Sequence, residues 1–256
     1  MNAQPPQRRF LVCCISLLFS AIAYADKGAS KNVILIIGDG FDDQHVTMGR
    51  NYLAGMSGML TLDKLPFRGA VQVETFSAAG QPVYVADSAN TATAIATGAI
   101  TSIGRVGTDI QDRDLPTIAE QAIASGLRVG LVTTSSITDA TPASFLTHVS
   151  SRSCEGPEEI LGSSYYGVPQ PTCPQDALQS NGPGSIIEQL AVSGAHVLFG
   201  GGEKFLGQIT ARGESVRSLA ERNGLRVLTE PDELKNLPTH QAVMGLFDSE
   251  NLEVRW

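Results

Sequence analysis

Residues 32–38 form a continuous apolar run that ends in the turn-forming triplet Gly38-Asp39-Gly40. A run of β-branched and leucine side chains without polar alternation is typical of a strand that is covered on both faces, as in parallel sheets. The run therefore predicts the first strand of the core, and it places Asp39 at the carboxyl end of that strand.

Helix-like and strand-like segments then alternate along the chain. A helical pattern followed by a short apolar strand occurs at 116–126 and 128–134, at 186–193 and 196–199, and at 215–223 and 225–228. Repeated helix-then-strand units indicate βαβ winding and a parallel sheet. The sequence predicts an α/β protein, and the Gly-, Pro- and Ser-rich residues 154–184 are expected to form a long surface loop.

Residues 1–25 have the three parts of a secretory signal peptide: Arg8 and Arg9, an apolar run at 10–22, and Ala23-Tyr24-Ala25 before Asp26. This apolar run is shorter than the about 20 residues that a membrane-spanning helix needs. We expect cleavage near Ala25, a secreted or periplasmic product without a stable membrane anchor, and one continuous domain over residues 26–256.

Charge and cysteine content restrict the partners and the compartment. Loss of residues 1–25, which carry two Arg and no acidic residue, changes the net charge from −8 to −10. So acidic a protein is not expected to present a nucleic-acid-binding surface. Of the four cysteines only Cys154 and Cys173 lie outside the signal peptide, and in an oxidising compartment we expect them to form one disulfide rather than remain free thiols.

Asp39 and Ser88 each allow a structural and a chemical interpretation. A carboxylate at the carboxyl end of a parallel strand is well placed to bind a metal ion, but Asp39 could equally cap the next helix. Ser88 begins an alanine-rich helical segment that stops at Gly98. It could be a helix cap, or a nucleophile that a zinc ion activates, because no histidine lies beside it in the sequence.

Asp139, Thr141 and Arg152 follow the strand predicted at 128–134. Carboxylate and hydroxyl oxygens suit a hard ion such as Mg²⁺, whereas the structural alternative is a helix cap at Thr141 with Pro142 at the first helical position. The guanidinium fork of Arg152 matches two phosphate oxygens, and its alternative is a solvated surface arginine.

Four motifs together resemble the alkaline phosphatase family, in the same order along the chain. They are Ile37-Gly-Asp39-Gly, Asp87-Ser88-Ala89 with its Thr- and Ala-rich continuation, Asp139-Ala-Thr141-Pro-Ala, and Ser151-Arg152-x-Cys154. The likeness runs from about Lys31 to Trp256. It implies a three-layer α/β sandwich with a largely parallel central sheet flanked by helices, incomplete at its C-terminus.

The resemblance also implies two Zn²⁺ ions, one Mg²⁺ ion and a role for each matched residue. Asp39 would bridge the second zinc and the magnesium, and Ser88 would bind that zinc and attack phosphorus to form phosphoserine. Thr141 and Asp139 would bind magnesium or its waters. Arg152 would clamp the phosphate with Asp87 orienting it, in a homodimeric enzyme that acts on small phosphomonoesters.

Later ligands of the family have no counterpart in this sequence. These are an acidic magnesium ligand, an Asp-x-x-x-His pair, and a Thr-Ala-Asp-His element followed by another histidine. We therefore expect an N-terminal part of a longer protein or a truncated product, with little phosphatase activity by itself. Competing functions are a non-catalytic secreted remnant, a phosphodiesterase, which usually has a Thr nucleophile, or a sulfatase, which usually has a Cys/Ser-x-Pro-x-Arg motif.

Overall fold

The computed structural model describes residues 32–165 and 168–253, so the predicted signal peptide lies outside the described residues. A boundary between Gly38 and Asp39 divides the described residues into two units. The helices are α1 (Asp43–Ala54), α2 (Ser88–Thr97), α3 (Ile118–Ala124), α4 (Ala140–Ala143), α5 (Ile186–Val192) and α6 (Val216–Arg222). The strands are β1 (Gly130–Ser136), β2 (Ser164–Tyr165), β3 (Val168–Pro169), β4 (Val197–Gly201), β5 (Arg226–Leu228) and β6 (Val243–Leu246).

Short 3₁₀ helices complete the connections, at Thr61–Lys64, Leu178–Ser180, Glu203–Phe205 and Pro231–Asn236. No helix in the described part of the chain is long and apolar enough to cross a membrane.

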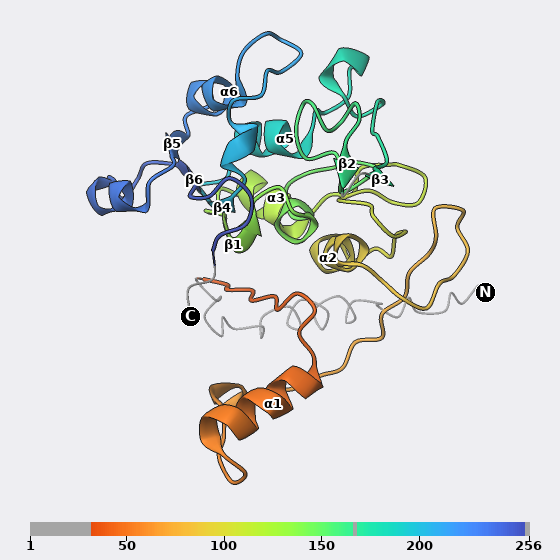
Figure 1. The fold of residues 1–256 in the computed structure, drawn as a ribbon, viewed down its shortest axis with the longest axis vertical. Helices are drawn as coiled ribbons and strands as arrows, with labels where there is room; N and C mark the ends of the chain where they lie inside the picture. Colours follow the sequence, from red (N-terminus) through yellow and green to blue (C-terminus); the bar gives the residue numbers. More distant parts are fainter. Residues whose placement is uncertain (1–31, 166–167, 254–256) are drawn as a thin grey trace, which may run out of the picture. The chain divides into compact units, whose positions relative to one another are not determined.

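A four-stranded parallel sheet forms the centre of the second unit, in the order β1-β4-β6-β5 (Figure 1). The central strands are the most apolar, and Leu198, Met244 and Leu246 are fully buried. Helices flank this sheet, which confirms the predicted α/β class and its βαβ winding. The predicted helix and strand units are confirmed within a few residues, as α3 and β1, α5 and β4, and α6 and β5.

Helices α5 and α6 pack against each other; α6 buries one apolar face, whereas α5 is buried over nearly its whole length and circumference. Ser185 and Glu188 form a capping box at the start of α5, and the following Ile186, Ile187 and Leu190 have no exposed surface. Burial of three such side chains contributes several kcal/mol. These caps and apolar faces explain why both helices were predictable from local pattern.

The prediction of a buried strand at 32–38 is wrong. Residues 33–38 have no strand hydrogen bonds, and the Ile36 side chain is 87% exposed. An extended apolar segment becomes a strand only when a neighbouring strand satisfies its backbone groups, and the described residues of the first unit, 32–38, contain no second strand. The sequence of this run has strand propensity, but it does not specify a partner strand.

The loop expected at 154–184 is only partly a surface loop. It contains the β2–β3 hairpin, and the predicted disulfide between Cys154 and Cys173 is present and fully buried. Ile160 and Ala177 are buried as well. The disulfide and these apolar contacts fix the segment against the domain. Its Gly and Pro content therefore predicted turns but did not predict how exposed the segment is.

Candidate active site

Helix α2 presents Ser88 as its first residue. Asp87 is the N-cap and accepts a hydrogen bond from the Asn90 backbone N–H, while Gly98 ends the helix in the left-handed conformation with φ 76°. Ser88 is therefore not the cap, which contradicts the structural alternative. Its hydroxyl is partly exposed at the helix terminus that favours anions.

Small side chains let α2 approach α4 closely. Ala89, Ala92 and Ala96 are buried on one face of α2, and the Ser144 hydroxyl contacts the Ala89 carbonyl oxygen at 3.4 Å. Because α4 follows the end of β1, this packing brings the start of α2 beside the residues that follow β1. The alanine content thus positions Ser88 next to the carboxyl end of the sheet.

Arg152 joins three of the predicted site residues. Its Nη1 donates to the Ser88 hydroxyl at 2.6 Å and lies 3.5 Å from an Asp87 carboxylate oxygen, and its Nη2 donates to Asp139 at 2.7 Å. The Arg152 side chain is 36% exposed and has ordered partners, so it is not a solvated surface arginine.

A backbone bridge at Gly104 supports the same arrangement. The Gly104 N–H donates to the Asp87 carboxylate at 3.2 Å, and its carbonyl accepts the Arg152 backbone N–H at 2.7 Å. The φ of +82° at Gly104 is one that glycine adopts readily. Sequence reasoning missed this residue, because a backbone contact leaves no side-chain signature.

Asp39 and Thr141 come together although 102 residues separate them. The Thr141 hydroxyl donates to an Asp39 carboxylate oxygen at 2.9 Å. Asp42, not Asp39, caps α1, and Asp139, not Thr141, caps α4. Both predicted alternatives for these positions, a cap at Asp39 and a cap at Thr141, are therefore wrong.

The donors that lie together at Asp39 are hard oxygens. The Asp39 carboxylate and the Thr141 hydroxyl suit Mg²⁺, and Asp139, two residues before Thr141, carries a further carboxylate, which accepts from Arg152. Zinc prefers nitrogen and sulfur ligands in addition to carboxylates, and the described residues contain no group of three or more His, Cys, Asp or Glu side chains arranged to hold a metal ion. The residues present therefore fit part of a metal site.

The turn that delivers Asp139 has its own support. The Ser136 and Thr138 hydroxyl oxygens are hydrogen-bonded at 2.7 Å, and the Thr138 hydroxyl donates to the Glu155 carboxylate. Burial raises the pKa of the Glu155 carboxyl, although the hydrogen bond from Thr138 opposes this effect. Glu155 was not among the predicted site residues, since an acidic residue beside a cysteine carries no recognisable motif.

The fold and the geometry define an α/β protein in which a helix-terminal serine, an arginine and several carboxylates meet at the carboxyl end of a parallel sheet. The family model for alkaline phosphatase matches residues 30–256. The chain belongs to the alkaline phosphatase family.

Curated relatives agree with this assignment. The chain is similar to an alkaline phosphatase of Escherichia coli K12, with 39% identity over 91% of this chain and 49% of the relative. It is also similar to streptomycin-6-phosphate phosphatase of Streptomyces griseus, with 37% identity over 98% of this chain and 57% of that protein. The chain thus spans about half the length of the curated relatives that it matches.

Solved structures give the same fold. A cold-active alkaline phosphatase from Shewanella sp. superposes with a TM-score of 0.63 at 28% identity, over 85% of this chain and 46% of that chain. The alkaline phosphatase of the Antarctic bacterium TAB5 superposes with a TM-score of 0.61 at 23% identity, over 87% of this chain and 55% of that chain, which supports the fold alone.

Proposed function

We propose that the protein carrying this sequence hydrolyses phosphate monoesters through a phosphoserine intermediate on Ser88. Membership of the alkaline phosphatase family supports the reaction class. The single observation that carries the assignment to these residues is the 2.6 Å contact between Arg152 Nη1 and the Ser88 hydroxyl oxygen. A guanidinium at this distance from a hydroxyl can bind the phosphate that the hydroxyl attacks.

Ser88 and Arg152 have complementary roles in this proposal. Ser88 Oγ gives its proton to solvent and attacks phosphorus, the ester P–O bond breaks, and the leaving oxygen takes a proton from solvent. The phosphoryl group is thereby transferred to the serine and an alcohol is released. Arg152 donates N–H groups to the non-bridging oxygens, and the N-terminus of α2 adds a favourable field for the negative charge. Water then attacks the phosphoserine and releases inorganic phosphate.

Asp87 and Asp139 act on Arg152 in this proposal. Asp87 accepts from Gly104 and lies beside the guanidinium, while Asp139 accepts from Nη2. Two carboxylates and a backbone contact thus limit the orientations of one side chain. Fixing the guanidinium before the substrate binds reduces the entropy that is lost when phosphate is bound.

The proposed cofactors are one Mg²⁺ and two Zn²⁺ ions. Asp39, Thr141 and Asp139 would contribute oxygens to magnesium, and Asp39 and Ser88 would contribute to one zinc ion. Bound zinc supplies a Lewis acid that favours the deprotonated serine and stabilises the leaving oxygen. Because the described residues offer only part of this site, we expect the 256-residue chain alone to bind less than two equivalents of zinc and to turn over substrate poorly.

The remaining features of the proposal concern location and partners. The signal-like residues 1–25 support export to the periplasm or beyond, with residues 26–256 forming part of an alkaline phosphatase domain. A relative is named for a phosphorylated antibiotic, so small phosphomonoesters are the proposed substrates. A homodimer is proposed from the family resemblance.

Covalent capture tests the central step. The whole enzyme that carries this sequence is mixed with a ³²P-labelled phosphomonoester, quenched in acid, digested and mapped by mass spectrometry. We expect label on the peptide that contains Ser88, none in Ser88→Ala, and unchanged labelling in Ser125→Ala, which removes an exposed serine at the end of α3. Label that persists in Ser88→Ala would refute the assignment.

A further inference from the structure

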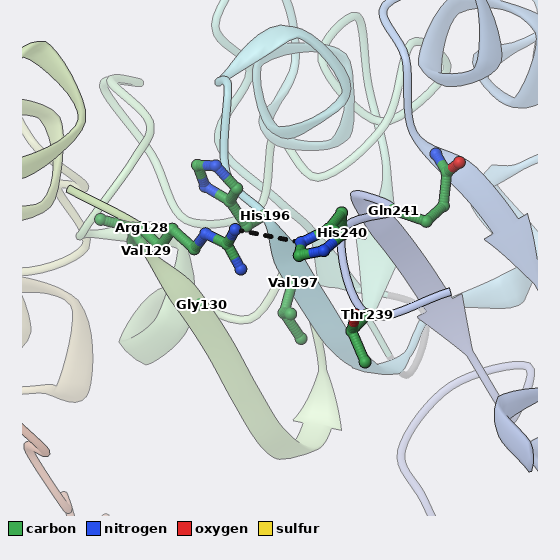
Figure 2. A pocket seen from close by; sticks show the side chains of 8 residues that line it. All are labelled: Arg128, Val129, Gly130, His196, Val197, Thr239, His240 and Gln241. Atoms are coloured by element: carbon green, nitrogen blue, oxygen red, sulfur yellow. Dashed lines mark hydrogen bonds between the residues drawn. The ribbon is translucent and has the colours of Figure 1, made fainter. Parts of the chain in front are cut away.

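A pocket lies at the opposite end of the sheet from Ser88. It has a volume of about 160 Å³, and it is lined by residues that immediately precede three neighbouring strands (Figure 2). Arg128 precedes β1, His196 precedes β4, and His240 lies just before β6. A single water needs about 10–15 Å³ of such space, so the pocket has room for several waters or one small ion.

The ionisable side chains that line this pocket are all basic. Arg128, His196 and His240 contribute, and no carboxylate lines the pocket, although the chain as a whole has a net charge of −8. Among the described residues Arg128 forms no ion pair. A concave site with only basic groups attracts anions.

Two of these groups have unused hydrogen-bonding capacity. The Nδ1 atom of His196 is buried and has no hydrogen-bond partner within the described part of the chain. Arg128 Nη2 lies 3.5 Å from His240 Nδ1, and the two side chains point toward each other in Figure 2. Since a guanidinium only donates, this long contact uses one N–H and leaves the others free for an acceptor.

We propose that this pocket, which we call the strand-start pocket, binds a small tetrahedral oxyanion such as inorganic phosphate. The guanidinium of Arg128 presents a planar fork that matches two oxyanion oxygens, and the imidazole N–H groups of His196 and His240 supply further donors. The Thr239 hydroxyl lines the same space.

The strand-start pocket is separate from the candidate active site. Arg128 lies before the first residue of β1, whereas Asp139 follows its last residue, Ser136. A strand of seven residues spans roughly 20 Å, so the two sites lie at opposite ends of the same strand. Oxyanion binding at one site can therefore be measured while the other is disabled, and this inference does not depend on the phosphatase proposal.

Histidine-resolved NMR tests this inference on the whole protein that carries this sequence. The imidazole signals of His196 and His240, each assigned by its loss in the matching Gln variant, are followed while inorganic phosphate is added at constant ionic strength. We expect saturable shifts at His196 and His240 that persist in Arg152→Ala, where the candidate active site is disabled. Sulfate, which has the same shape, should compete with phosphate.

Matched arginine variants decide the outcome. Arg128→Gln should weaken phosphate binding about tenfold or more, since it removes a charge-assisted contact. Arg212→Gln, which removes another exposed arginine, should leave binding unchanged. Non-saturable shifts, equal responses in the two variants, or shifts that disappear in Arg152→Ala would overturn the proposal. If Arg128→Gln unfolds, phosphate binding by His240→Gln is compared with that by Arg212→Gln instead.

Discussion

Arg152 Nη1 lies 2.6 Å from the Ser88 hydroxyl oxygen, although 64 residues separate the two in the sequence. The contact depends on two separate supports. Asp87 caps the helix that Ser88 begins, and Asp139, at the end of the turn after β1, accepts from the same guanidinium. The serine and the arginine therefore belong to one preorganised group before any substrate is present.

Replacing Arg152 with alanine should impair the enzyme that carries this chain. A hydrogen bond to a charged group contributes about 1.5–3 kcal/mol, so kcat/KM for a phosphomonoester should fall at least about tenfold. Inhibition by inorganic phosphate should weaken in parallel. The kcat/KM of Arg152→Lys should lie between those of the parent and Arg152→Ala, because lysine keeps the charge but loses the planar fork.

Steady-state kinetics with a chromogenic phosphomonoester measure these changes. Arg212→Ala serves as the control, since Arg212 is exposed and lies outside the site. Equal kcat/KM values for the Arg152→Ala and Arg212→Ala enzymes would contradict the role of Arg152 in phosphate binding.

Local pattern predicted the helices and strands that carry their own caps and apolar faces. Helix α5 is an example, because Ser185, Glu188 and the buried Ile186 are all close in sequence. The strand predicted at 32–38 was wrong for the opposite reason, since strand formation depends on a partner strand that the run itself does not specify. Local propensity and tertiary pairing are separate requirements.

The sequence indicated candidate site residues but not the contacts between them. Ser88 and Arg152 were each ambiguous between a structural and a chemical role, and only their order along the chain suggested one site. The structure brings Thr141 to Asp39 and Arg152 to Ser88. Gly104 contributes through its backbone, and no sequence pattern reports a contact of that kind.

Loss of the disulfide should destabilise the domain. Cys154 and Cys173 are 19 residues apart and fully buried. Closing a loop of this length lowers the entropy of the unfolded chain, and the double replacement Cys154→Ala/Cys173→Ala should cost about 3 kcal/mol in free energy of unfolding. Urea denaturation of the oxidised protein and of the variant gives this difference.

A reducing agent provides the control for the disulfide prediction. It should lower the stability of the parent protein and leave that of the double variant unchanged. If the parent and the double variant unfold at the same urea concentration, the bond does not contribute to stability.

His148 should make stability depend on pH. Its Nδ1 lies 2.8 Å from the Gly107 carbonyl oxygen and its Nε2 lies 2.8 Å from a Glu120 carboxylate oxygen, so both ring nitrogens face acceptors. Burial lowers the pKa of His148, but these two hydrogen bonds together with the negative charges of Glu120 and Asp114 outweigh burial, and the pKa is raised above its ordinary value of 6.5. The imidazolium form therefore stabilises the native state.

The sign of this effect follows from the raised pKa. The contribution of His148 is fully present below its ordinary value of 6.5 and is lost as the pH rises through the raised native value. His148→Gln should thus lower the free energy of unfolding most in mild acid and less in alkali. Replacing the exposed His45 by Gln is the control, and a His148→Gln effect that grows toward alkaline pH would contradict the prediction.

Glu155 should change the pH dependence of stability in the direction opposite to that of an ordinary ion-paired carboxylate. Burial raises the pKa of its carboxyl above the ordinary 4.5, despite the hydrogen bond from Thr138. The native state then binds this proton more tightly than the unfolded chain does, so stability falls as the pH rises from 4.5 through the raised native value. Glu155→Gln keeps an acceptor for the Thr138 hydroxyl but cannot ionise.

The Glu155→Gln protein should therefore be more stable than the parent at about pH 8, and the two should converge at about pH 3.5, where the carboxyl is largely protonated in both states. Urea denaturation at both pH values measures the difference. Glu158→Gln, which removes an exposed negative charge three residues further on, controls for the change in net charge. A Glu155→Gln protein that is less stable than the parent at about pH 8 would show that the ionised carboxylate stabilises the turn before Asp139, with Thr138 and Lys204 as its compensating partners.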